Sequence, residues 1–265
     1  MPQPRVLIIR APGTNCDVEA AFAFARAGAT TKTLHINRVL EKSRLVQEFE
    51  ILCFPGGFSY GDDIAAGRIQ GNQIRFYLAD ALHEFKAAGK LVLGICNGFQ
   101  VLIKSGILLE DAPAAAGQQA AASAPPATLV GNALGKFEDR WVHLKTSGTK
   151  CVFFAGIDTM YLPVAHAEGK FVARARNSLD ALAAAGQLVL RYVSASGGSA
   201  EYPDNPNGST DDVAGVCDAT GRVCGLMPHP ERYIERTQHP RWTRGEGTEE
   251  GDGLRVFRNA VGYFQ

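Results

Sequence analysis

Cys96 is the residue whose neighbours point most directly to chemistry. It stands between Gly94 and Gly98 in LVLGICNGFQ, which runs from an apolar segment into a predicted helix. Gly-x-nucleophile-x-Gly at a strand-to-helix turn is the pattern of a nucleophile elbow, here with Cys in place of Ser. Such a turn strains the nucleophile's backbone, and side chains at the flanking positions would collide with the neighbouring strand or helix. The helix dipole would favour the thiolate. The alternative is an ordinary buried cysteine.

A cysteine nucleophile needs a base and a group that orients this base. His229 and Glu231 are two residues apart, so their side chains fall on the same side of an extended chain. Pro230 restricts the backbone between them. Taken alone, His229 could be a surface turn residue and Glu231 an acid at a helix N-terminus. Together with the elbow motif, the pair favours a catalytic interpretation in which the carboxylate holds one imidazole nitrogen and the other faces the thiol.

Acyl chemistry also needs donors for a tetrahedral oxyanion, and backbone N–H groups suit this task because they are fixed in advance. In elbow enzymes one donor belongs to the residue after the nucleophile, here Asn97. The second is predicted from the pair Gly56-Gly57, which follows an apolar strand segment and also makes a tight turn.

The elements that must position these residues alternate between strand and helix. Strands are predicted at 5–10, 29–36, 50–54 and 91–95, and helices at about 17–27, 44–49, 73–88 and 97–105. Asn15 or Asp17 is the predicted cap of the first helix. This alternation predicts the α/β class, with βαβ units, a mostly parallel central sheet and helices on both faces. Ligands bind beyond the carboxyl ends of such strands, where both Gly56-Gly57 and Cys96 lie.

In the second half of the chain the predicted strands no longer alternate regularly with helices. Segment 111–129 is rich in Ala, Pro and Gln and is predicted to be a surface insertion without a packed core, and 238–253 is predicted to be a polar loop. Further strands are predicted at 140–145, 151–155, 170–174 and 188–193, helices at 179–185 and 254–263, and a late β-hairpin from 212–217 and 222–227. We expect one domain over 1–265 that carries these two insertions.

Composition narrows the classes of function. The chain has 265 residues, of which 46% are hydrophobic, and Lys plus Arg (27) balances Asp plus Glu (27), so nothing points to nucleic acid. No signal-peptide layout or membrane-spanning run is seen, so we expect a cytoplasmic protein with no membrane contact. The six cysteines form no Cys-x-x-Cys pair, and neither a metal site nor a disulfide framework is predicted.

Three segments together resemble the class I, triad-type glutamine amidotransferases, namely FPGGFSYGD (54–62), GICNGFQ (94–100) and MPHPER (227–232). The chain is also similar to the family of glutaminase subunits of phosphoribosylformylglycinamidine synthase, through PGTNCD (12–17), SYGDD (59–63), FEDRWV (137–142) and AHAEGKF (165–171). The resemblance covers nearly the whole chain and implies a flavodoxin-like amidotransferase domain. The segments 111–129 and 238–253 are longer than we expect for a compact subunit of this kind.

The resemblance implies a reaction on glutamine. Cys96 would attack the side-chain amide, ammonia would leave, and water would hydrolyse the glutamyl thioester. His229 would act as general base and acid, oriented by Glu231. The oxyanion hole would consist of Gly57 and Asn97.

Four further residues receive roles near the substrate. Gln100 stands one helical turn after the nucleophile, and the resemblance implies that it holds the glutamine; the alternative is a solvent-facing helix residue. Gly56 is assigned to substrate binding as well. His166 and Glu168 would line the glutamine pocket or contact a partner, and a structural role is the alternative.

A glutaminase that released free ammonia would waste it. The chain has no Gly-x-x-x-x-Gly-Lys-Ser/Thr loop, so no cofactor is expected on it and the ATP-dependent step must lie on another chain. The resemblance implies a large synthase subunit, which would bind ATP and Mg²⁺ and convert phosphoribosylformylglycinamide to the amidine, and a small adaptor subunit. We expect low activity until the partner orders the site.

Three alternatives stay open. Cysteine hydrolases of the intracellular peptidase or chaperone type place His directly after the nucleophile, where this chain has Asn97, and they lack the late His-Pro-Glu. A non-catalytic regulatory subunit would have lost Cys96, His229 or Glu231. A glutaminase that serves a different ATP-dependent synthase is disfavoured only by the resemblance of SYGDD and AHAEGKF.

Overall fold

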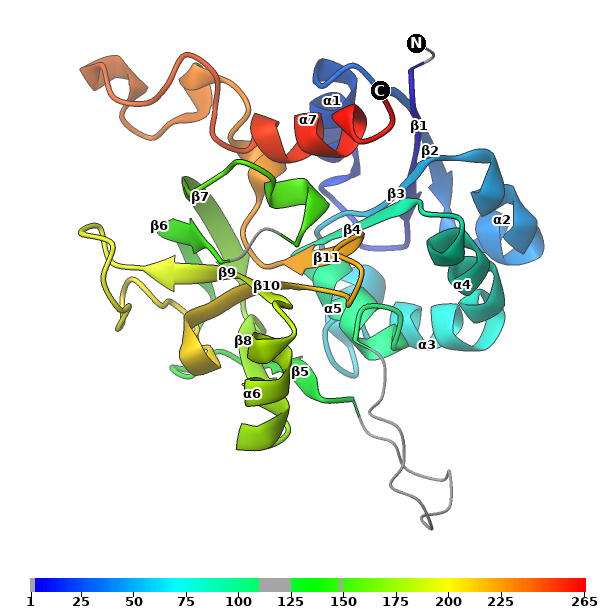
Figure 1. The fold of residues 1–265 in the computed structure, drawn as a ribbon, viewed down its shortest axis with the longest axis horizontal. Helices are drawn as coiled ribbons and strands as arrows, with labels where there is room; N and C mark the ends of the chain where they lie inside the picture. Colours follow the sequence, from blue (N-terminus) through cyan, green and yellow to red (C-terminus); the bar gives the residue numbers. More distant parts are fainter. Residues whose placement is uncertain (1–2, 110–124, 148–149) are drawn as a thin grey trace.

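The computed structural model describes residues 3–109, 125–147 and 150–265. Nine strands form the central sheet: β1 (Arg5–Arg10), β2 (Thr30–His35), β3 (Ile51–Phe54), β4 (Leu91–Ile95), β6 (Glu138–Thr146), β7 (Thr159–His166), β9 (Leu188–Val193), β10 (Val213–Cys217) and β11 (Val223–Leu226). Their order is β2-β1-β3-β4-β11-β10-β9-β6-β7 (Figure 1). The strands from β2 to β11 run parallel, and pairing is antiparallel from β11 to β7.

Helices cover both faces of the parallel half. They are α1 (Asp17–Arg26), α2 (Ile36–Glu41), α3 (Arg68–Tyr77), α4 (Ala79–Ala87), α5 (Asn97–Ser105) and α7 (Leu254–Gly262). Helix α6 (Arg176–Ala184) lies elsewhere, against strand β8 (Lys170–Ala173). α1 and α7 pack together on one face, where the rings of Phe24 and Phe257 meet edge to face at 4.9 Å, and α3, α4 and α5 lie on the other (Figure 1). The predicted α/β class, with its largely parallel sheet, its flanking helices and its late β10–β11 hairpin, is confirmed.

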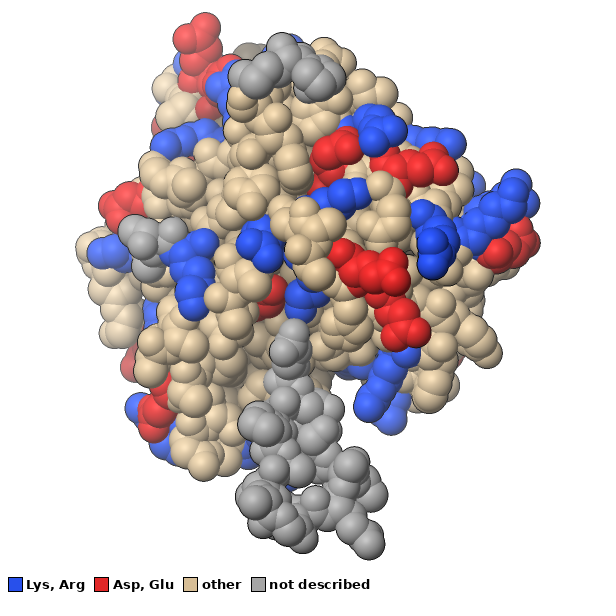
Figure 2. All heavy atoms as spheres, turned by 45° about the vertical axis from the view of Figure 1, so that its right-hand side comes forward, with Lys and Arg blue, Asp and Glu red and all other residues tan. Residues whose placement is uncertain are grey.

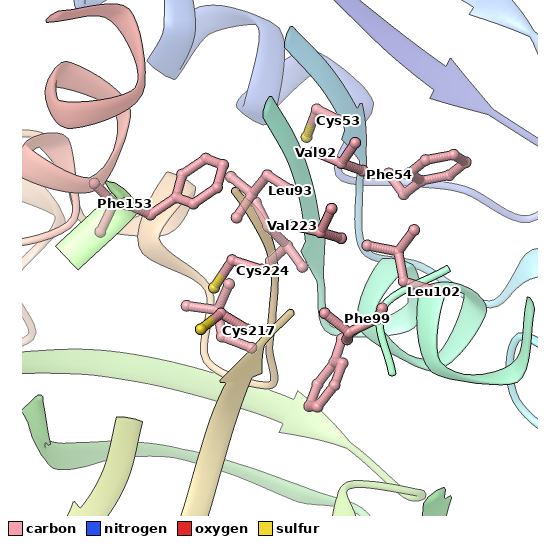
Figure 3. Packing of buried hydrophobic residues seen from close by; sticks show 14 of the residues in the cluster. Cys53, Phe54, Val92, Leu93, Phe99, Leu102, Phe153, Cys217, Val223 and Cys224 are labelled. Carbon is pink, nitrogen blue, oxygen red and sulfur yellow. The ribbon is translucent and has the colours of Figure 1, made fainter. Parts of the chain in front are cut away.

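β4 runs through the centre of the core. All five of its residues are buried, as expected of a parallel strand covered on both faces. Val92 and Leu93 point to opposite faces of the strand (Figure 3). On the face that α5 covers, Gly94 lies close to the side chain of Leu102 and Gly225 of β11 lies close to the ring of Phe99. Burying each such side chain contributes about 1.5–3 kcal/mol. The strand that carries the nucleophile is therefore held from both sides.

Several predicted elements differ from the structure. The helix expected at 73–88 is two helices, α3 and α4, separated at Leu78, and 44–49 is part of a 3-10 helix, η1 (Ser43–Glu48), that follows the unpredicted α2. Neither Asn15 nor Asp17 caps α1, because Asp17 is already its first residue and Cys16 stands at the cap position. A side chain can cap a helix only from the position just outside it.

Two differences concern the second half. Segment 151–155 is not a strand but contains the 3-10 helix η4 (Val152–Phe154), and the unpredicted strand β7 pairs with β6. Residues 111–124 of the expected insertion lie outside the described residues, but its end is not a coreless surface segment. Ala127 and Leu129 are buried in strand β5 (Ala127–Val130), which pairs with β8 (Lys170–Ala173) in a separate two-stranded sheet. The segment 238–253 is mostly exposed, with a short 3-10 helix at Trp242–Arg244.

The surface carries both signs of charge. Figure 2 shows Lys and Arg side chains interspersed with Asp and Glu over the face that it presents, in keeping with the equal totals of the two kinds. Among the described residues, no helix combines the length and the apolarity that crossing a bilayer requires. The organisation of 1–265 as one domain stays a prediction.

Candidate active site

The turn between β4 and α5 has the geometry of a nucleophile elbow. Cys96 adopts φ 51° and ψ −107°, a left-handed conformation that costs a non-glycine residue about 1–3 kcal/mol. A Cβ atom on Gly98 would lie 1.8 Å from the Phe54 carbonyl oxygen of β3, and one on Gly94 would lie 2.6 Å from Leu102 Cδ1 of α5. The predicted collisions with strand and helix are thus confirmed. The backbone N–H of Cys96 donates to Leu226 O at 2.8 Å, which anchors the strained residue to β11.

β11 delivers His229 and Glu231 to this turn. The N–H of His229 donates to Pro163 O of β7 at 2.9 Å, and the chain then enters a 3-10 helix, η6 (Pro230–Arg232). His229 Nδ1 lies 2.6 Å from Glu231 Oε1, and both side chains are buried. The structure therefore brings the two together on a helical turn rather than on an extended strand. Their catalytic roles stay predictions.

A pocket of about 190 Å³ opens over the elbow. Cys96 and His229 line it together with Gly57, and its other lining residues are Asn15, Cys16, Phe58, Phe137, Asp139, Ala165 and Arg232. Cys96 Sγ donates a hydrogen bond to Ala165 O at 3.7 Å. The predicted nucleophile, base and oxyanion glycine thus share one cavity, large enough to admit a small polar molecule.

The electrostatics of His229 suit a base. Burial alone would lower the pKa of His229, but the Glu231 carboxylate and the thiols of Cys96 and Cys16 together raise it well above its usual value. An imidazole with a raised pKa accepts a proton from a thiol more readily, and the carboxylate stabilises the imidazolium that results. The arrangement would favour transfer of a thiol proton to the imidazole.

The predicted oxyanion donors belong to the turn after β3 and to the first residue of α5. Gly57 has φ 143°, and a Cβ there would lie 2.7 Å from Gly13 O, so this position requires glycine. The turn after β1 pairs with the turn after β3 through two backbone hydrogen bonds, from Phe58 N to Gly13 O and from Asn15 N to Gly56 O. The N–H of Gly57 takes no part in this pairing. Asn97 is the first residue of α5, where a backbone N–H has no intrahelical acceptor.

The side chains of Asn97 and Gln100, which follow the nucleophile, form a chain of hydrogen bonds beside the site. Asn97 accepts from Ser59 N at 3.1 Å and donates to Gln100 Oε1 at 2.9 Å. Gln100 Nε2 in turn donates to Glu168 O at 2.5 Å. Gln100 is buried, so its interpretation as a solvent-facing residue is wrong, but it does not line the pocket. Its contact with glutamine stays a prediction.

Gly56, His166 and Glu168 do not line the pocket, and their contacts lie around it. A Cβ on Gly56 would lie 2.8 Å from His229 Cε1, so the glycine lets backbone approach the imidazole. His166 is buried, its Nδ1 lies 3.2 Å from Asn132 Oδ1, and burial lowers its pKa to about 3. Glu168 accepts from Ala66 N at 3.2 Å. These contacts favour structural roles for both side chains.

Cys16 is one of the pocket residues to which we assigned no role from sequence. It is buried, lines the cavity and receives a hydrogen bond from Arg232 Nη2 at 3.1 Å. The segment PGTNCD could have placed Cys16 near the site. This turn follows β1, and the carboxyl ends of parallel strands lie at one edge of the sheet. The adjacency of Cys16 to His229 depends on strand order, which is a tertiary property.

Comparison with known proteins agrees with this geometry. Residues 3–264 match the family described as CobB/CobQ-like glutamine amidotransferase domain. The chain belongs to this glutamine amidotransferase family. A relative from Dehalococcoides mccartyi, named phosphoribosylformylglycinamidine synthase subunit PurQ, is 45% identical over 265 residues, which covers 98% of each chain. A relative of the same name from Methanococcus maripaludis is 40% identical over 273 residues, covering 98% of this chain and 97% of its own. The predicted family is confirmed.

Solved structures show the same fold. The structure of PurLQS from Thermotoga maritima contains a chain that superimposes with a TM-score of 0.72 at 30% identity, with all of both chains covered. A glutamine amidotransferase, also from Thermotoga maritima, reaches a TM-score of 0.52 at 17% identity, over 92% of this chain and 83% of the other. The second likeness shows the fold alone.

Proposed function

We propose that this chain is the glutaminase subunit of phosphoribosylformylglycinamidine synthase. It hydrolyses the side-chain amide of glutamine and delivers ammonia to a synthase subunit that makes phosphoribosylformylglycinamidine in purine biosynthesis. The observation that carries the proposal is the pocket lined by Cys96 and by His229, whose Nδ1 contacts Glu231, in a chain 45% identical to a PurQ subunit. We propose that 1–265 acts as one domain.

The geometry suggests how the residues divide the work. His229 takes the thiol proton of Cys96, and the thiolate attacks the amide carbon of glutamine. The resulting oxyanion accepts hydrogen bonds from the N–H groups of Gly57 and Asn97. His229 then gives its proton to the leaving ammonia and activates the water that hydrolyses the thioester, while Glu231 keeps its Nδ1–H oriented.

Glutamine itself would be held by Gly56 and Gln100, two residues that lie outside the lining of this cavity. Gly56 presents backbone against the imidazole, and Gln100 would contact the substrate only if its amide leaves the Glu168 carbonyl that it bonds at 2.5 Å. That exchange would accompany ordering of the site by a partner, which fits the expectation of low activity in the isolated chain.

The ATP-dependent step belongs to the partner in this proposal. ATP and Mg²⁺ would bind to the large synthase subunit, a small adaptor subunit would complete the hetero-oligomer, and this chain would carry no cofactor of its own. The likeness to a chain of PurLQS supports an assembly of this kind. We propose a cytoplasmic location for this chain.

The test separates the two half-reactions. Cys96→Ala in the reconstituted complex should abolish glutamine-dependent synthesis, while synthesis from added ammonium continues. Cys151→Ala is the matched control, because Cys151 is equally buried but does not line the pocket, and it should keep both activities. If Cys96→Ala retains glutamine-dependent synthesis, Cys96 is not the nucleophile and the proposal fails.

A further inference from the structure

Cys16 places a third metal-ligating side chain beside the predicted base and its carboxylate. Cys16 Sγ, an imidazole nitrogen of His229 and a carboxylate oxygen of Glu231 all lie within 4.8 Å of one another, and all three residues are buried. We propose that they form a binding site for a thiophilic divalent cation, Zn²⁺ or Cd²⁺, whose occupancy inhibits glutamine hydrolysis. The inhibition rests on the proposed function, whereas the binding does not.

The ligand set suits such a cation. Thiolate, imidazole and carboxylate are the three ligand types of zinc, at about 2.3, 2.0–2.1 and 2.0–2.2 Å from the metal. Ligand atoms around a tetrahedral ion are then about 3.2–3.7 Å apart. Any separation near the 4.8 Å limit would have to shorten, and the 2.6 Å contact between His229 Nδ1 and Glu231 Oε1 would have to open. Three protein ligands leave a fourth position open. Cys16 and His229 line the pocket, which gives the ion a route of entry.

Two polar atoms at the site lack a partner. Among the residues that the structure describes, no hydrogen bond reaches Glu231 Oε2 or His229 Nε2, although both atoms are buried. The thiols of Cys16 and Cys96 lie close enough to raise the pKa of His229, and Nε2 has no hydrogen-bond partner in the described residues. A buried polar atom without a partner costs about 1–3 kcal/mol. A cation between the thiol, the imidazole and the carboxylate would remove part of this cost.

One neighbouring charge opposes the cation. Arg232 Nη2 lies 3.1 Å from Cys16 Sγ, and the guanidinium is held there by Glu19, which accepts from Arg232 Nε at 3.4 Å. The guanidinium favours the Cys16 thiolate but repels a divalent ion next to it. We therefore expect weaker binding than at a closed structural zinc site, and tighter binding when the charge of Arg232 is removed.

Occupancy would block catalysis at the base. A metal that takes the imidazole and the carboxylate prevents His229 from accepting the thiol proton of Cys96. Ammonium-dependent synthesis needs none of these groups. In the complex, zinc should therefore suppress glutamine-dependent synthesis and leave ammonium-dependent synthesis unchanged.

Direct binding to the full chain tests the site. Cd²⁺ is titrated into the reduced protein, and the ultraviolet charge-transfer band of Cd–thiolate is followed together with equilibrium dialysis. Cys16→Ser should lose one equivalent of bound Cd²⁺ or weaken its binding at least tenfold, and Arg232→Gln should tighten it several-fold. Cys96→Ala is the matched control, since it removes the other thiol of the pocket and keeps the three ligands, so it should bind as the natural chain does.

Each contrary result has a definite meaning. The site is refuted if the natural chain binds no stoichiometric Cd²⁺, if Cys16→Ser binds it with unchanged affinity, or if Cys96→Ala loses it. Circular dichroism and thermal melting verify that each variant is folded. Absence of glutamine-dependent synthesis without any metal would instead refute the proposed function, and it would leave the binding result intact.

Discussion

Gly98→Ala tests the link between backbone geometry and chemistry at the elbow. The new Cβ would lie 1.8 Å from Phe54 O and 2.5 Å from Phe54 C in β3. Non-bonded atoms of this size make contact at about 3.5 Å, so the first turn of α5 must retreat from β3 by about 1.5 Å. Overpacking of this kind costs about 1–3 kcal/mol of folding stability. A misplacement of about 1 Å in a catalytic group lowers the rate about 100-fold.

The assay compares two activities of the reconstituted complex. We expect Gly98→Ala to lower glutamine-dependent synthesis about 100-fold or more, to leave ammonium-dependent synthesis intact, and to lower the urea midpoint of the isolated chain. Gly131→Ala is the control, because a Cβ at this exposed glycine meets no heavy atom within 4 Å. If Gly98→Ala matches Gly131→Ala in both activity and midpoint, the close approach of α5 to β3 does not position the nucleophile.

Three further predictions concern titratable groups. Glu231→Gln should lower the pKa of His229, seen by NMR, and lower glutamine-dependent kcat about 10³-fold, since the carboxylate no longer stabilises the imidazolium; an unchanged pKa would contradict this. His166 has a pKa of about 3 when folded and about 6.5 when unfolded, so the unfolded chain binds the extra proton between these values and stability falls as pH falls. Urea midpoints should show a loss of about 2–3 kcal/mol from pH 7 to pH 4.5 that His166→Asn lacks. Lys86 Nζ donates to Ile107 O at 2.9 Å and lies 3.6 Å from Asp218 Oδ2, so Lys86→Met should cost about 3–5 kcal/mol in urea unfolding, and adding Asp218→Asn should restore part of it.

The elbow could be predicted from sequence because its determinants are local. Gly94, Cys96 and Gly98 lie within five residues, and the strand and the helix on either side have clear apolar patterns. Helix α5 begins and ends where the periodicity places it, and β1, β4 and β9 have their predicted bounds. In each of these segments the local pattern and the tertiary environment favour the same structure.

The missed elements depend on contacts that local patterns do not encode. β7 contains Pro163 and alternates buried with half-buried residues, and it becomes a strand because β6 pairs along its whole length. The break at Leu78 falls within a continuous helical pattern, where the packing of α3 against α5 and of α4 against η1 separates the two helices. Segment 151–155 is apolar enough for a strand, yet it packs as a short turn beneath α7. Tertiary packing overrides a weak local preference in all three cases.

The candidate site shows how the two halves of the sheet cooperate. β3, β4 and β11 are adjacent parallel strands, so the oxyanion glycine, the nucleophile and the base emerge at one edge although they are far apart in sequence. The antiparallel half then closes the site, because β7 contributes Pro163 O to the N–H of His229 and Ala165 O to the thiol of Cys96. A shift of β7 would move the base and release the thiol at the same time. A partner that contacts β7 or the AHAEG turn after it is therefore well placed to control glutamine hydrolysis, which gives the expected low activity of the isolated chain a structural basis.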